Sequence, residues 1–428
     1  MRGGLSKTLA LVGAAGLLAV SACGNSDNSS GGGGGNSSAS KDVTVFTWWA
    51  DGGEKAGLDG LVSVFGTDCK DFKFVNSAVA GGAGSNAKQV LANDLQAGKP
   101  PSTFQAHAGA ELKDYINAGQ VDDVSQLYKD FGLDKAFPQN LIDNLTVDGK
   151  IYSIPANVHR ANMVWVNPTV LKKASIDATK APANVDAWIA DLTKLKAAGV
   201  TAPLAISKGF AQEMLVEAVL LGELGPDKFK GLWDGKTDWA GGDVTAALNK
   251  YKTLLTFTNT DREAIDWPDA LGYVNSGKAG YTLMGDWVAA QQLADKIPDS
   301  AYTYWPSPGT GEDFQFLSDS FTLPTNGADP DGAKCWLKTV GSAEGQKAFN
   351  TKKGSIPARS DADPADYPKY QQGAMADWKK DTIVPSCAHG AACTAGQNND
   401  ILSALSQFSG SPDVAKLQSA LATAMKTN

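Results

Sequence analysis

VTVFTWWADGGEKAGLDGLVSVFGTDCKDFKFVNSAV, residues 43–79, contains the clearest evidence for the fold class. Its opening VTVF has the β-branched and aromatic character of a buried strand. Apolar side chains then recur at Leu58, Leu61, Val62 and Phe65, which is the spacing of one helix face. A second strand-like run follows over residues 71–79. Strand, helix and strand in this order predict a parallel sheet covered by helices, and therefore an α/β fold.

Helix signals continue through the rest of the chain. Apolar periodicity, together with Ser, Asp or Pro at a starting position, marks each of them. The predicted helices run from a cap at Ser85 to Gly98, over 185–198, over 212–224, and onward from Asp329-Pro330.

The residues before this stretch indicate an export and anchoring signal. Arg2 and Lys7 precede an apolar run over residues 9–20, and the run ends in VSAC at Cys23. This predicts a signal peptide at 1–22, because the run is too short to span a membrane. Small residues before Cys23 resemble a lipobox, so we expect that cysteine to carry lipid; an ordinary signal with a chance cysteine is the alternative. Residues 23–40 then form the anchor and a flexible Gly/Ser/Asn linker.

Composition limits the class of protein. The remaining length is enough for two lobes with cores of their own. Charged residues make up 20% of the chain and the net charge is −8, so no basic surface for nucleic acid is indicated. Four cysteines besides Cys23 suit disulfides in an oxidising compartment. A metal site is the rival interpretation, but the chain has no CxxC pair.

FTWWADGGE, at the end of the first predicted strand, carries two adjacent tryptophans. Neighbouring side chains in a strand face opposite ways, so Trp48 and Trp49 cannot both enter the same side of a core. Ligands of open α/β sheets bind beyond the carboxyl ends of strands. One tryptophan can therefore close the core while the other faces a crevice with Glu54 at its rim. The alternative is that both pack against helices.

Other stretches combine aromatic rings with planar or charged hydrogen-bonding groups. Each is weak alone, but together they suit a sugar, whose apolar face stacks on a ring and whose hydroxyls bond polar groups. The residues concerned are Gln105 and His107, Asn157 with His159 and Arg160, Trp267, Asp286 with Trp287, Asp319, Lys353 with Arg359, and His389.

These stretches also resemble a known family. WWADGGE, VAGGAGSNAKQVL, PPSTFQAHAG, GKIYSIPANVHRANMVW, MGDW, LSDSF and KKGSIPARSD are similar to the glucose/galactose-binding lipoproteins of bacterial sugar ABC importers. These belong to the extracellular solute-binding proteins (family 1), with the maltose-binding proteins. The resemblance runs from about residue 43 to 389 and loosens afterwards. It implies a two-lobed periplasmic-binding-protein (Venus-flytrap, type II) fold with the sugar in the cleft, one lobe at 41–157 and 318–353, the other at 158–317 and 354–428.

The resemblance also implies a set of sugar-binding residues. Tryptophans stack on the ring, while amide, imidazole, carboxylate and ammonium groups take the hydroxyls. The matching positions are Trp48, Trp49, Glu54, Gln105, His107, Trp267, Asp319, Lys353 and His389, with Arg160, Asp286 and Trp287 at or just behind the sugar.

The implied function is substrate binding for a carbohydrate ABC transporter, without enzyme activity or cofactor. A lipid-anchored monomer on the outer face of the membrane would capture a hexose, glucose first, close over it and deliver it to the permease subunits. Galactose, xylose and a short oligosaccharide remain open as ligands. A secreted glycoside hydrolase is the main rival and would use two carboxylates such as Asp286 and Asp319. The chain has no GxSxG, HExxH or P-loop motif.

The lobe boundaries also predict a disulfide pairing. Cys69 and Cys335 fall in the same implied lobe, so we expect them to pair. Cys387 and Cys393 would then close a small loop around His389, provided that the chain turns at Gly390.

Overall fold

The computed structural model describes residues 41–81 and 84–426. The predicted signal peptide at 1–22, the lipid-anchor cysteine Cys23 and the linker to residue 40 lie outside the described residues. Within the described part, no helix combines the length and the apolar character that a membrane span requires.

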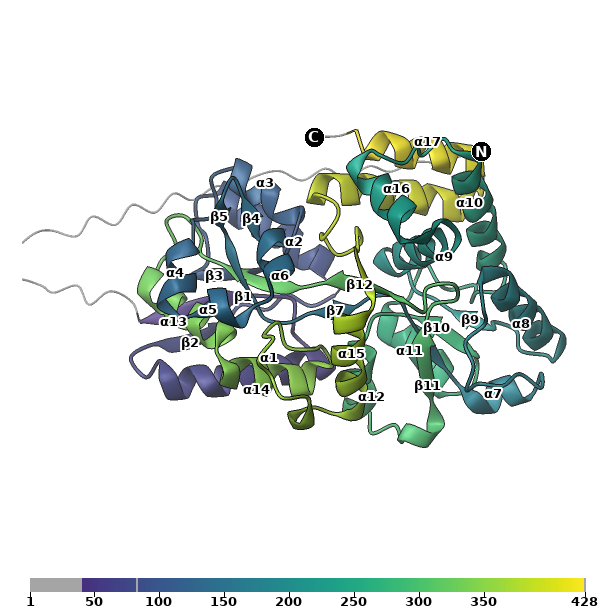
Figure 1. Cartoon of the computed structure of the whole chain (residues 1–428), viewed down its shortest axis with the longest axis horizontal. Coiled ribbons are helices and arrows are strands. Elements are labelled where there is room, and N and C mark those ends of the chain that lie inside the picture. The colour runs from purple at the N-terminus through teal and green to yellow at the C-terminus, as the bar shows by residue number, and fades with distance from the viewer. Residues whose placement is uncertain (1–40, 82–83, 427–428) are drawn as a thin grey trace, which may run out of the picture. The chain divides into compact units, whose positions relative to one another are not determined.

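The N-terminal lobe is built on a five-stranded sheet (Figure 1). β1 pairs in parallel with β2 and β3, while β13 is antiparallel to β3 and β6. The parallel strand–helix–strand unit predicted from residues 43–79 is thereby confirmed. In sheet order the strands are β2 (Lys73–Asn76), β1 (Asp42–Phe46), β3 (Thr103–His107), β13 (Asp319–Thr322) and β6 (Ser153–Pro155).

Helices and a small hairpin surround this sheet. The hairpin pairs β4 (Thr146–Val147) with β5 (Lys150–Ile151). The helices are α1 (Gly52–Asp68), α2 (Ser85–Gln96), α3 (Glu111–Asn117), α4 (Ser125–Asp130), α5 (Leu133–Ala136), α6 (Gln139–Asn144), α13 (Pro330–Gly341) and α14 (Ala343–Lys353).

Helix α1 buries the face that its sequence predicted. Leu58, Leu61 and Phe65 are almost fully buried in the same core as the strand residues of β1. Helix α1 also packs against α14. The two helices approach so closely that a Cβ at Gly60 would lie 2.3 Å from the carbonyl oxygen of Ala348. This close packing places Lys353, at the end of α14, beside the start of α1.

Two boundaries in this lobe differ from the sequence prediction. β2 covers only Lys73–Asn76 rather than 71–79, because it is an edge strand and pairs only with residues 42–45 of β1. Helix α2 begins at Ser85, but the capping position is Gly84, whose φ of 97° suits glycine. The helix ends at Gln96, shortly before Gly98.

The C-terminal lobe has its own sheet, in the order β11-β8-β10-β9. Its strands are β8 (Met163–Val166), β9 (Leu204–Ala205), β10 (Tyr281–Leu283) and β11 (Thr303–Pro306). Its helices are α7 (Pro168–Lys172), α8 (Val185–Ala197), α9 (Phe210–Asp234), α10 (Gly242–Leu255), α11 (Trp267–Asn275), α12 (Val288–Ala294), the short 3-10 turn η2 (Asp299–Ala301), α16 (Ala395–Gly410) and α17 (Val414–Ala424).

Helix α9 explains why the sequence predicted a helix ending near residue 224. The helical backbone breaks at Gly225 (φ 75°, ψ 167°), directly before Pro226, and then resumes. The first half of α9 is buried on nearly all sides, since helices α10 and α16 pack against it (Figure 1). Two glutamates within this half, Glu213 and Glu217, are therefore inside the lobe.

A third sheet lies where the chain passes between the lobes. It contains β14 (Thr382–Pro385), β12 (Asp313–Leu317) and β7 (His159–Arg160), in that order. Val158 and Ile356 exchange two backbone hydrogen bonds of 2.8 and 3.0 Å, and the Ser318 hydroxyl donates to the Asn157 carbonyl at 2.6 Å. Three crossing segments are thus tied together at one place.

The buried apolar side chains form a separate cluster in each lobe. One contains the β1 and α1 residues, and the other contains those of β8 and α9. Residues after the third crossing divide between them, since Ile356 and Met375 belong to the first cluster and Ile401 to the second. The connecting elements there are η3 (Pro364–Asp366) and α15 (Lys369–Lys380).

Both predicted disulfides are present. Cys69 pairs with Cys335, with a Cα–Cα distance of 6.1 Å, and joins the end of α1 to α13. Cys387 pairs with Cys393, at 4.8 Å, and closes the small loop that contains His389. Gly390 has a φ of 66°, which is the turn that the pairing required. We call residues 387–393 the disulfide loop.

Candidate functional site

A small cavity of about 20 Å³ lies between the lobes. This volume has room for about one water molecule, so the side chains that line the cavity lie close together. Its walls come from strand ends, helix starts and the disulfide loop, where side chains can project without disturbing a sheet. The residues that line it are Trp48, Glu54, His107, His159, Trp267, Trp287, Leu317, Asp319, Lys353 and His389.

The two adjacent tryptophans follow β1, which ends at Phe46, and their side chains lie in different surroundings. Trp49 is fully buried in the N-terminal core, with its ring centroid 4.5 Å from that of Phe349 and 5.6 Å from that of Phe321. Trp48 turns the other way, lines the cavity and lies 5.0 Å from the His107 ring. One tryptophan therefore closes the core and the other faces the cleft.

Two more tryptophans reach the cavity from the C-terminal lobe. Trp267 is the first residue of α11, where Asp266 and Asp269 form a capping box that fixes the helix start. Trp287 lies directly before α12, and its ring is 5.3 Å from the His389 ring. Trp48 and Trp267 also line a second hollow, which shares Glu54 with the cavity. The cavity thus has aromatic walls from both lobes.

Asp319 is the carboxylate at the cavity floor. Gln105 Nε2 and Asn157 Nδ2 each donate to it at 2.8 Å, and the nearest nitrogens of His107 and His159 lie 3.8 and 3.6 Å away. Burial acts to raise its pKa, but the Lys353 cation and the two imidazoles outweigh burial and hold the pKa below its usual value. Asp319 therefore stays ionised and acts as a hydrogen-bond acceptor.

Lys353 supplies the cation of the site. Its Nζ lies 3.1 Å from Glu54 Oε1 and 3.2 Å from His159 Nε2, and it is almost fully buried. His159 is held from behind, because its Nδ1 bonds the Asp286 carboxylate. The polar groups around the cavity thus bond one another in this structure, and each has hydrogen-bonding capacity that a hydroxyl could share.

A second charged group supports the opposite wall. Glu111 Oε2 accepts from Lys88 Nζ at 2.7 Å and lies 2.8 Å from His107 Nδ1. Burial would raise the pKa of Glu111, but the Lys88 cation and His107 lower it far below its usual value. The carboxylate therefore fixes the orientation of the His107 ring. Lys88 lies in the quoted stretch VAGGAGSNAKQVL, but neither Lys88 nor Glu111 was among the expected site residues, because no local pattern marks their contacts with each other and with His107.

The disulfide loop brings His389 to the cavity from the C-terminal lobe. Its Nδ1 lies 3.2 Å from Ser386 Oγ, whereas its Nε2 has no hydrogen-bond partner among the described residues although it is buried. The same loop contacts the N-terminal lobe, since the Glu111 backbone N–H donates to the Gly390 carbonyl at 3.0 Å. The loop therefore belongs both to the cavity and to the contact between lobes.

Eight of the twelve residues expected at the site line the cavity, and four do not. Trp49 lies in the core, and Gln105 lies behind the wall, where it bonds Asp319 and Thr47. Asp286 bonds His159 and the Arg160 backbone, while the Arg160 guanidinium bonds Asp377 and Asp381. The eight that line the cavity are Trp48, Glu54, His107, Trp267, Trp287, Asp319, Lys353 and His389.

Two cavity residues were not in the expected set. His159 was visible in the sequence only as part of the polar stretch PANVHR, and its role depends on Lys353 and Asp286, which are distant in sequence. Leu317 ends strand β12 and gave no polar signal.

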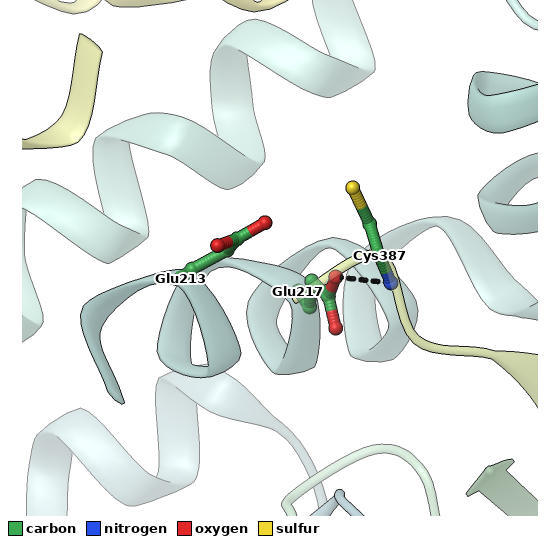
Figure 2. Close-up of side chains that lie close together, drawn as sticks. All are labelled: Glu213, Glu217 and Cys387. Carbon is green, nitrogen blue, oxygen red and sulfur yellow. Dashed lines mark hydrogen bonds between the residues drawn. The ribbon is translucent and has the colours of Figure 1, made fainter. Parts of the chain in front are cut away.

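One group of side chains has the composition of a metal site. Glu213, Glu217 and Cys387 place potential ligand atoms within 4.8 Å of one another among the described residues. However, the Cys387 sulfur is bonded to Cys393, and Glu217 accepts hydrogen bonds from the loop backbone, one of which Figure 2 shows. A disulfide sulfur is not a thiolate ligand, so the donor set does not fit a metal ion.

The sequence matches a family of known function. Residues 31–347 match the model of the bacterial extracellular solute-binding proteins. An uncharacterised ABC transporter extracellular-binding protein of Pyrococcus horikoshii is 32% identical over 98% of this chain and 95% of its own. A probable sugar-binding periplasmic protein of Brucella suis is 31% identical, over 86% and 88% of the two chains. The glucose-binding protein of Saccharolobus solfataricus is 24% identical over 77% and 64%.

Solved structures show the same fold. The bacterial solute receptor AcbH, described as preferring β-D-galactopyranose, superposes with a TM-score of 0.77 at 18% identity and covers 90% of this chain and 97% of its own. A chitin oligosaccharide binding protein gives 0.78 at 20% identity, over 90% and 98%. Such proteins bind solutes outside the cell and are not enzymes. The chain belongs to the bacterial extracellular solute-binding proteins, as the exported, two-lobed sugar-binding component of an ABC transporter.

Proposed function

We propose that the interlobe cavity binds a single hexose, glucose in first place. The observation that carries this proposal is the combination of tryptophan walls from both lobes with the unpartnered, buried Nε2 of His389. An aromatic wall suits the apolar face of a pyranose ring, and the polar groups suit its hydroxyls.

Ionised groups supply the strongest hydrogen bonds to such a ligand. Asp319 and Glu54 can accept from hydroxyls, while Lys353 can donate to them. His107 and His159 are held in fixed orientations by Glu111 and Asp286. Because a site built to bond hydroxyls rejects analogues that lack them, this arrangement would select by hydroxyl position.

The preference for glucose has two supports. The sequence stretches resemble those of the glucose/galactose-binding lipoproteins, and the relative from Saccharolobus solfataricus is named as a glucose-binding protein. Galactose is the main competitor, because it differs from glucose only in the direction of one hydroxyl. The solved galactose-preferring receptor has the same fold but only 18% identity, so it does not decide between the two sugars.

The charge state of Asp319 argues against glycosidase chemistry at this site. A glycosidase needs one carboxylic acid whose pKa is raised so that it can protonate the leaving group. Asp319 has its pKa held low by Lys353 and two histidines, against the effect of burial. Asp286, the other candidate, is turned toward His159 and the Arg160 backbone and does not line the cavity.

A calorimetric titration of purified protein tests the proposal. The panel contains glucose, galactose, xylose, maltose and a longer glucan, with Trp267→Ala as the site variant. We expect glucose to bind most tightly, and Trp267→Ala to weaken glucose binding at least tenfold, or about 1.4 kcal/mol, without a change of fold. Tighter binding of xylose or maltose would overturn the hexose proposal. If Trp267→Ala bound glucose as tightly as the parent does, the cavity would not be the glucose-binding site.

We further propose that the protein acts as a monomer, held at the outer face of the membrane by lipid on Cys23, and presents its closed form to the permease subunits. The lobes then follow the boundaries 41–157 with 318–353, and 158–317 with 354–428. Metabolic labelling with an alkyne fatty acid tests the anchor. Cys23→Ser should lose both the label and the membrane association, and a labelled Cys23→Ser protein would exclude this attachment site.

A further inference from the structure

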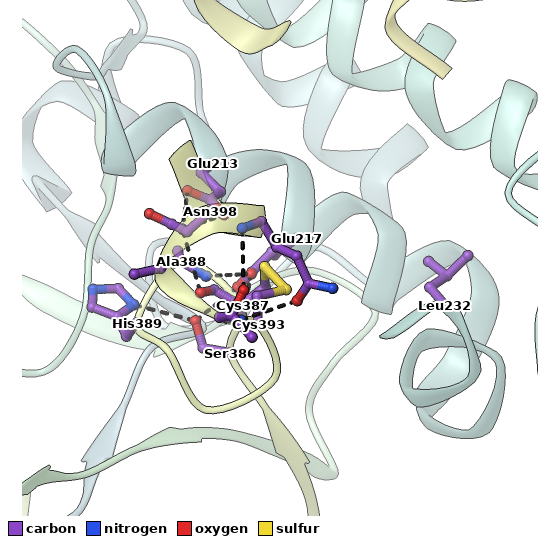
Figure 3. The surroundings of a disulfide bond; sticks show 12 residues. Glu213, Glu217, Leu232, Ser386, Cys387, Ala388, His389, Cys393 and Asn398 are labelled. Atoms are coloured by element: carbon purple, nitrogen blue, oxygen red, sulfur yellow. Dashed lines mark hydrogen bonds between the residues drawn. A yellow bond between two sulfur atoms is a disulfide. The ribbon is translucent and has the colours of Figure 1, made fainter. Parts of the chain in front are cut away.

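Glu217 lies behind the cavity and bonds the base of the disulfide loop. It is fully buried on helix α9 and bonds four groups (Figure 3). Its Oε1 accepts from the backbone N–H groups of Cys387 at 2.7 Å and Ala388 at 2.8 Å. Its Oε2 accepts from the Ser386 hydroxyl at 2.9 Å and from the side-chain amide of Gln315. A buried carboxylate with this many donors is well suited to its ionised form.

A second buried carboxyl lies one helical turn earlier. Glu213 bonds only the side-chain amide of Asn398, at 2.9 and 3.0 Å, among the hydrogen bonds in the described residues. Burial and the Glu217 charge raise the pKa of Glu213 well above its usual value, while burial raises that of Glu217 to about 7. Two neighbouring carboxyls rarely ionise together, so Glu213 holds the proton of the pair and Glu217 is the acceptor.

The Ser386 hydroxyl transmits this charge state to His389. A hydroxyl has one hydrogen, and the Glu217 carboxylate takes it. Ser386 Oγ can then only accept toward Nδ1 of His389, 3.2 Å away, so that nitrogen must carry a hydrogen. His389 itself is neutral, because burial first, and then the nearby cations and imidazoles, lower its pKa well below the usual value. A neutral imidazole with its hydrogen on Nδ1 has a bare lone pair on Nε2.

We propose that Glu217 is a positioning residue that, acting through Ser386, fixes the tautomer of His389 and makes Nε2 a hydrogen-bond acceptor in the cavity. Nε2 is buried and unpartnered among the described residues, and His389 lines the cavity. The site therefore requires a hydroxyl that donates at this point. This last step rests on the proposed sugar-binding function, whereas the tautomer itself does not.

Replacement of one Glu217 carboxylate oxygen by an amide nitrogen should reverse the direction of the hydrogen bonds through Ser386 to His389. In Glu217→Gln, the new amide nitrogen donates to Ser386 Oγ, so the serine hydrogen turns to His389 Nδ1 and the imidazole hydrogen moves to Nε2. Side-chain ¹⁵N NMR of the ligand-free protein distinguishes the two tautomers. The His389 signals are assigned by their loss in His389→Gln. We expect the Nδ1–H form in the parent and the Nε2–H form in Glu217→Gln; the Nε2–H form in the parent would overturn the proposal.

Three further variants separate positioning from general destabilisation. Glu213→Gln makes the same chemical change one turn away without a bond to Ser386, and should keep the Nδ1–H form. Ser386→Ala removes the acceptor for Nδ1–H and should give a mixture of tautomers, while Ser386→Thr should restore the parent form. If Glu217→Gln does not fold, Ser386→Ala still decides, because an unchanged tautomer in that variant would show that Ser386 does not set it.

A set of deoxyfluoro-glucoses tests the consequence for the ligand. Fluorine in place of one hydroxyl cannot donate a hydrogen bond, so the analogue changed at the His389 position should bind the parent at least tenfold more weakly than glucose. In Glu217→Gln, where Nε2 would donate, the same analogue should lose less than threefold against glucose. Equal losses in the two proteins would reject the ligand step. Failure of every sugar to bind would reject the proposed function and leave the NMR result standing.

Discussion

At the scale of single residues, the adjacent tryptophans should respond differently to truncation. Trp49→Ala removes a fully buried ring that packs on Phe321 and Phe349, so it should cost roughly 3–5 kcal/mol of unfolding free energy. Trp48→Ala removes a cavity wall and should weaken glucose binding at least tenfold, or about 1.4 kcal/mol, with a smaller loss of stability. Thermal melts and calorimetric titrations measure both. If Trp49→Ala mainly lost affinity and Trp48→Ala mainly lost stability, Trp49 and not Trp48 would contact the sugar.

Glu213 should make stability depend on pH. Its folded pKa is raised well above its usual value, chiefly by burial, while an unfolded glutamate ionises near 4.3. The folded protein thus keeps a proton that the unfolded chain has lost, and its stability falls as pH rises above about 4.3. Glu213→Gln carries no ionisable group, so its stability relative to the parent should increase by up to ~1.4 kcal/mol per pH unit until the folded pKa is reached.

Urea unfolding of the parent and of Glu213→Gln between pH 5 and pH 8 measures this difference. Glu344→Gln, an exposed change on α14, is the matched control for the loss of a carboxylate. A constant difference for Glu213→Gln would mean that Glu213 is ionised in the folded protein.

Residue roles were predictable from sequence only where a local rule was sufficient. Side-chain alternation predicted that Trp48 and Trp49 face opposite ways, although both follow the end of β1 at Phe46. Trp49 is buried through its packing on Phe349, which is distant in sequence. Likewise, Arg160 follows His159 directly, yet its guanidinium lies away from the cavity because Asp377 and Asp381 bind it. Nothing near Arg160 in the sequence contains that information.

At the scale of elements, the two disulfides should have separable roles. Cys69–Cys335 has a sequence separation of 266 and joins α1 to α13, so replacing both cysteines with serine should lower stability by roughly 2–4 kcal/mol and leave sugar affinity unchanged. Cys387–Cys393 has a separation of only 6 and a smaller entropic effect. Its loss should instead weaken binding roughly fivefold, or about 1 kcal/mol, because the disulfide loop positions His389.

Titration and melting of the two double variants check this prediction. When a reductant breaks one of the two disulfides in the parent protein, the parent should show the same stability and sugar affinity as the double variant that lacks that disulfide. An affinity loss confined to the Cys69/Cys335 variant would mean that the binding geometry is transmitted through α1 and not through the disulfide loop.

Elements with strong local patterns were predictable, and those defined by distant partners were not. β1, α1 and α13 lie where the β-branched and aromatic run, the helical spacing and the Asp329 cap predicted them. The sheet of β7, β12 and β14 had no such signal, because two-residue β7 exists only through its pairing with β12, far along the chain. The hydrogen bonds between the disulfide loop and Glu217 could not be predicted either, because they also join residues that are distant in sequence.

At the scale of the whole molecule, sugar should close the two lobes. The crossing segments near Asn157, Ser318 and Ile356 are short and hydrogen-bonded to one another, so they can act together as a hinge. The cavity groups lie on both sides of it, and a ligand that bonds both lobes favours the closed form by its differential affinity. Small-angle scattering should therefore give a smaller radius of gyration with saturating glucose. Equal radii would mean that the ligand-free protein is already closed.

The contact of α1 with α12 offers a way to test closure without replacing a cavity residue. Gly53, in α1 of the N-terminal lobe, faces Ala290 in α12 of the C-terminal lobe, and a Cβ there would lie 2.7 Å from the Ala290 Cβ and 2.9 Å from its backbone carbon. No real Cβ approaches backbone so closely, so Gly53→Ala should hold the lobes apart. We expect at least tenfold weaker glucose binding, or about 1.4 kcal/mol, and a larger radius of gyration at saturating sugar than in the parent.

Gly66→Ala is the matched control for that variant. It makes the same substitution in the same helix, with the same gain in helix propensity of roughly 0.5–1 kcal/mol, but a Cβ at Gly66 has nothing within 4 Å. Gly66→Ala should therefore bind glucose and close as the parent does, with equal or higher stability. If Gly53→Ala did the same, the contact between α1 and α12 would not belong to the sugar-bound state, and affinity would have to arise from the lobes in a more open arrangement.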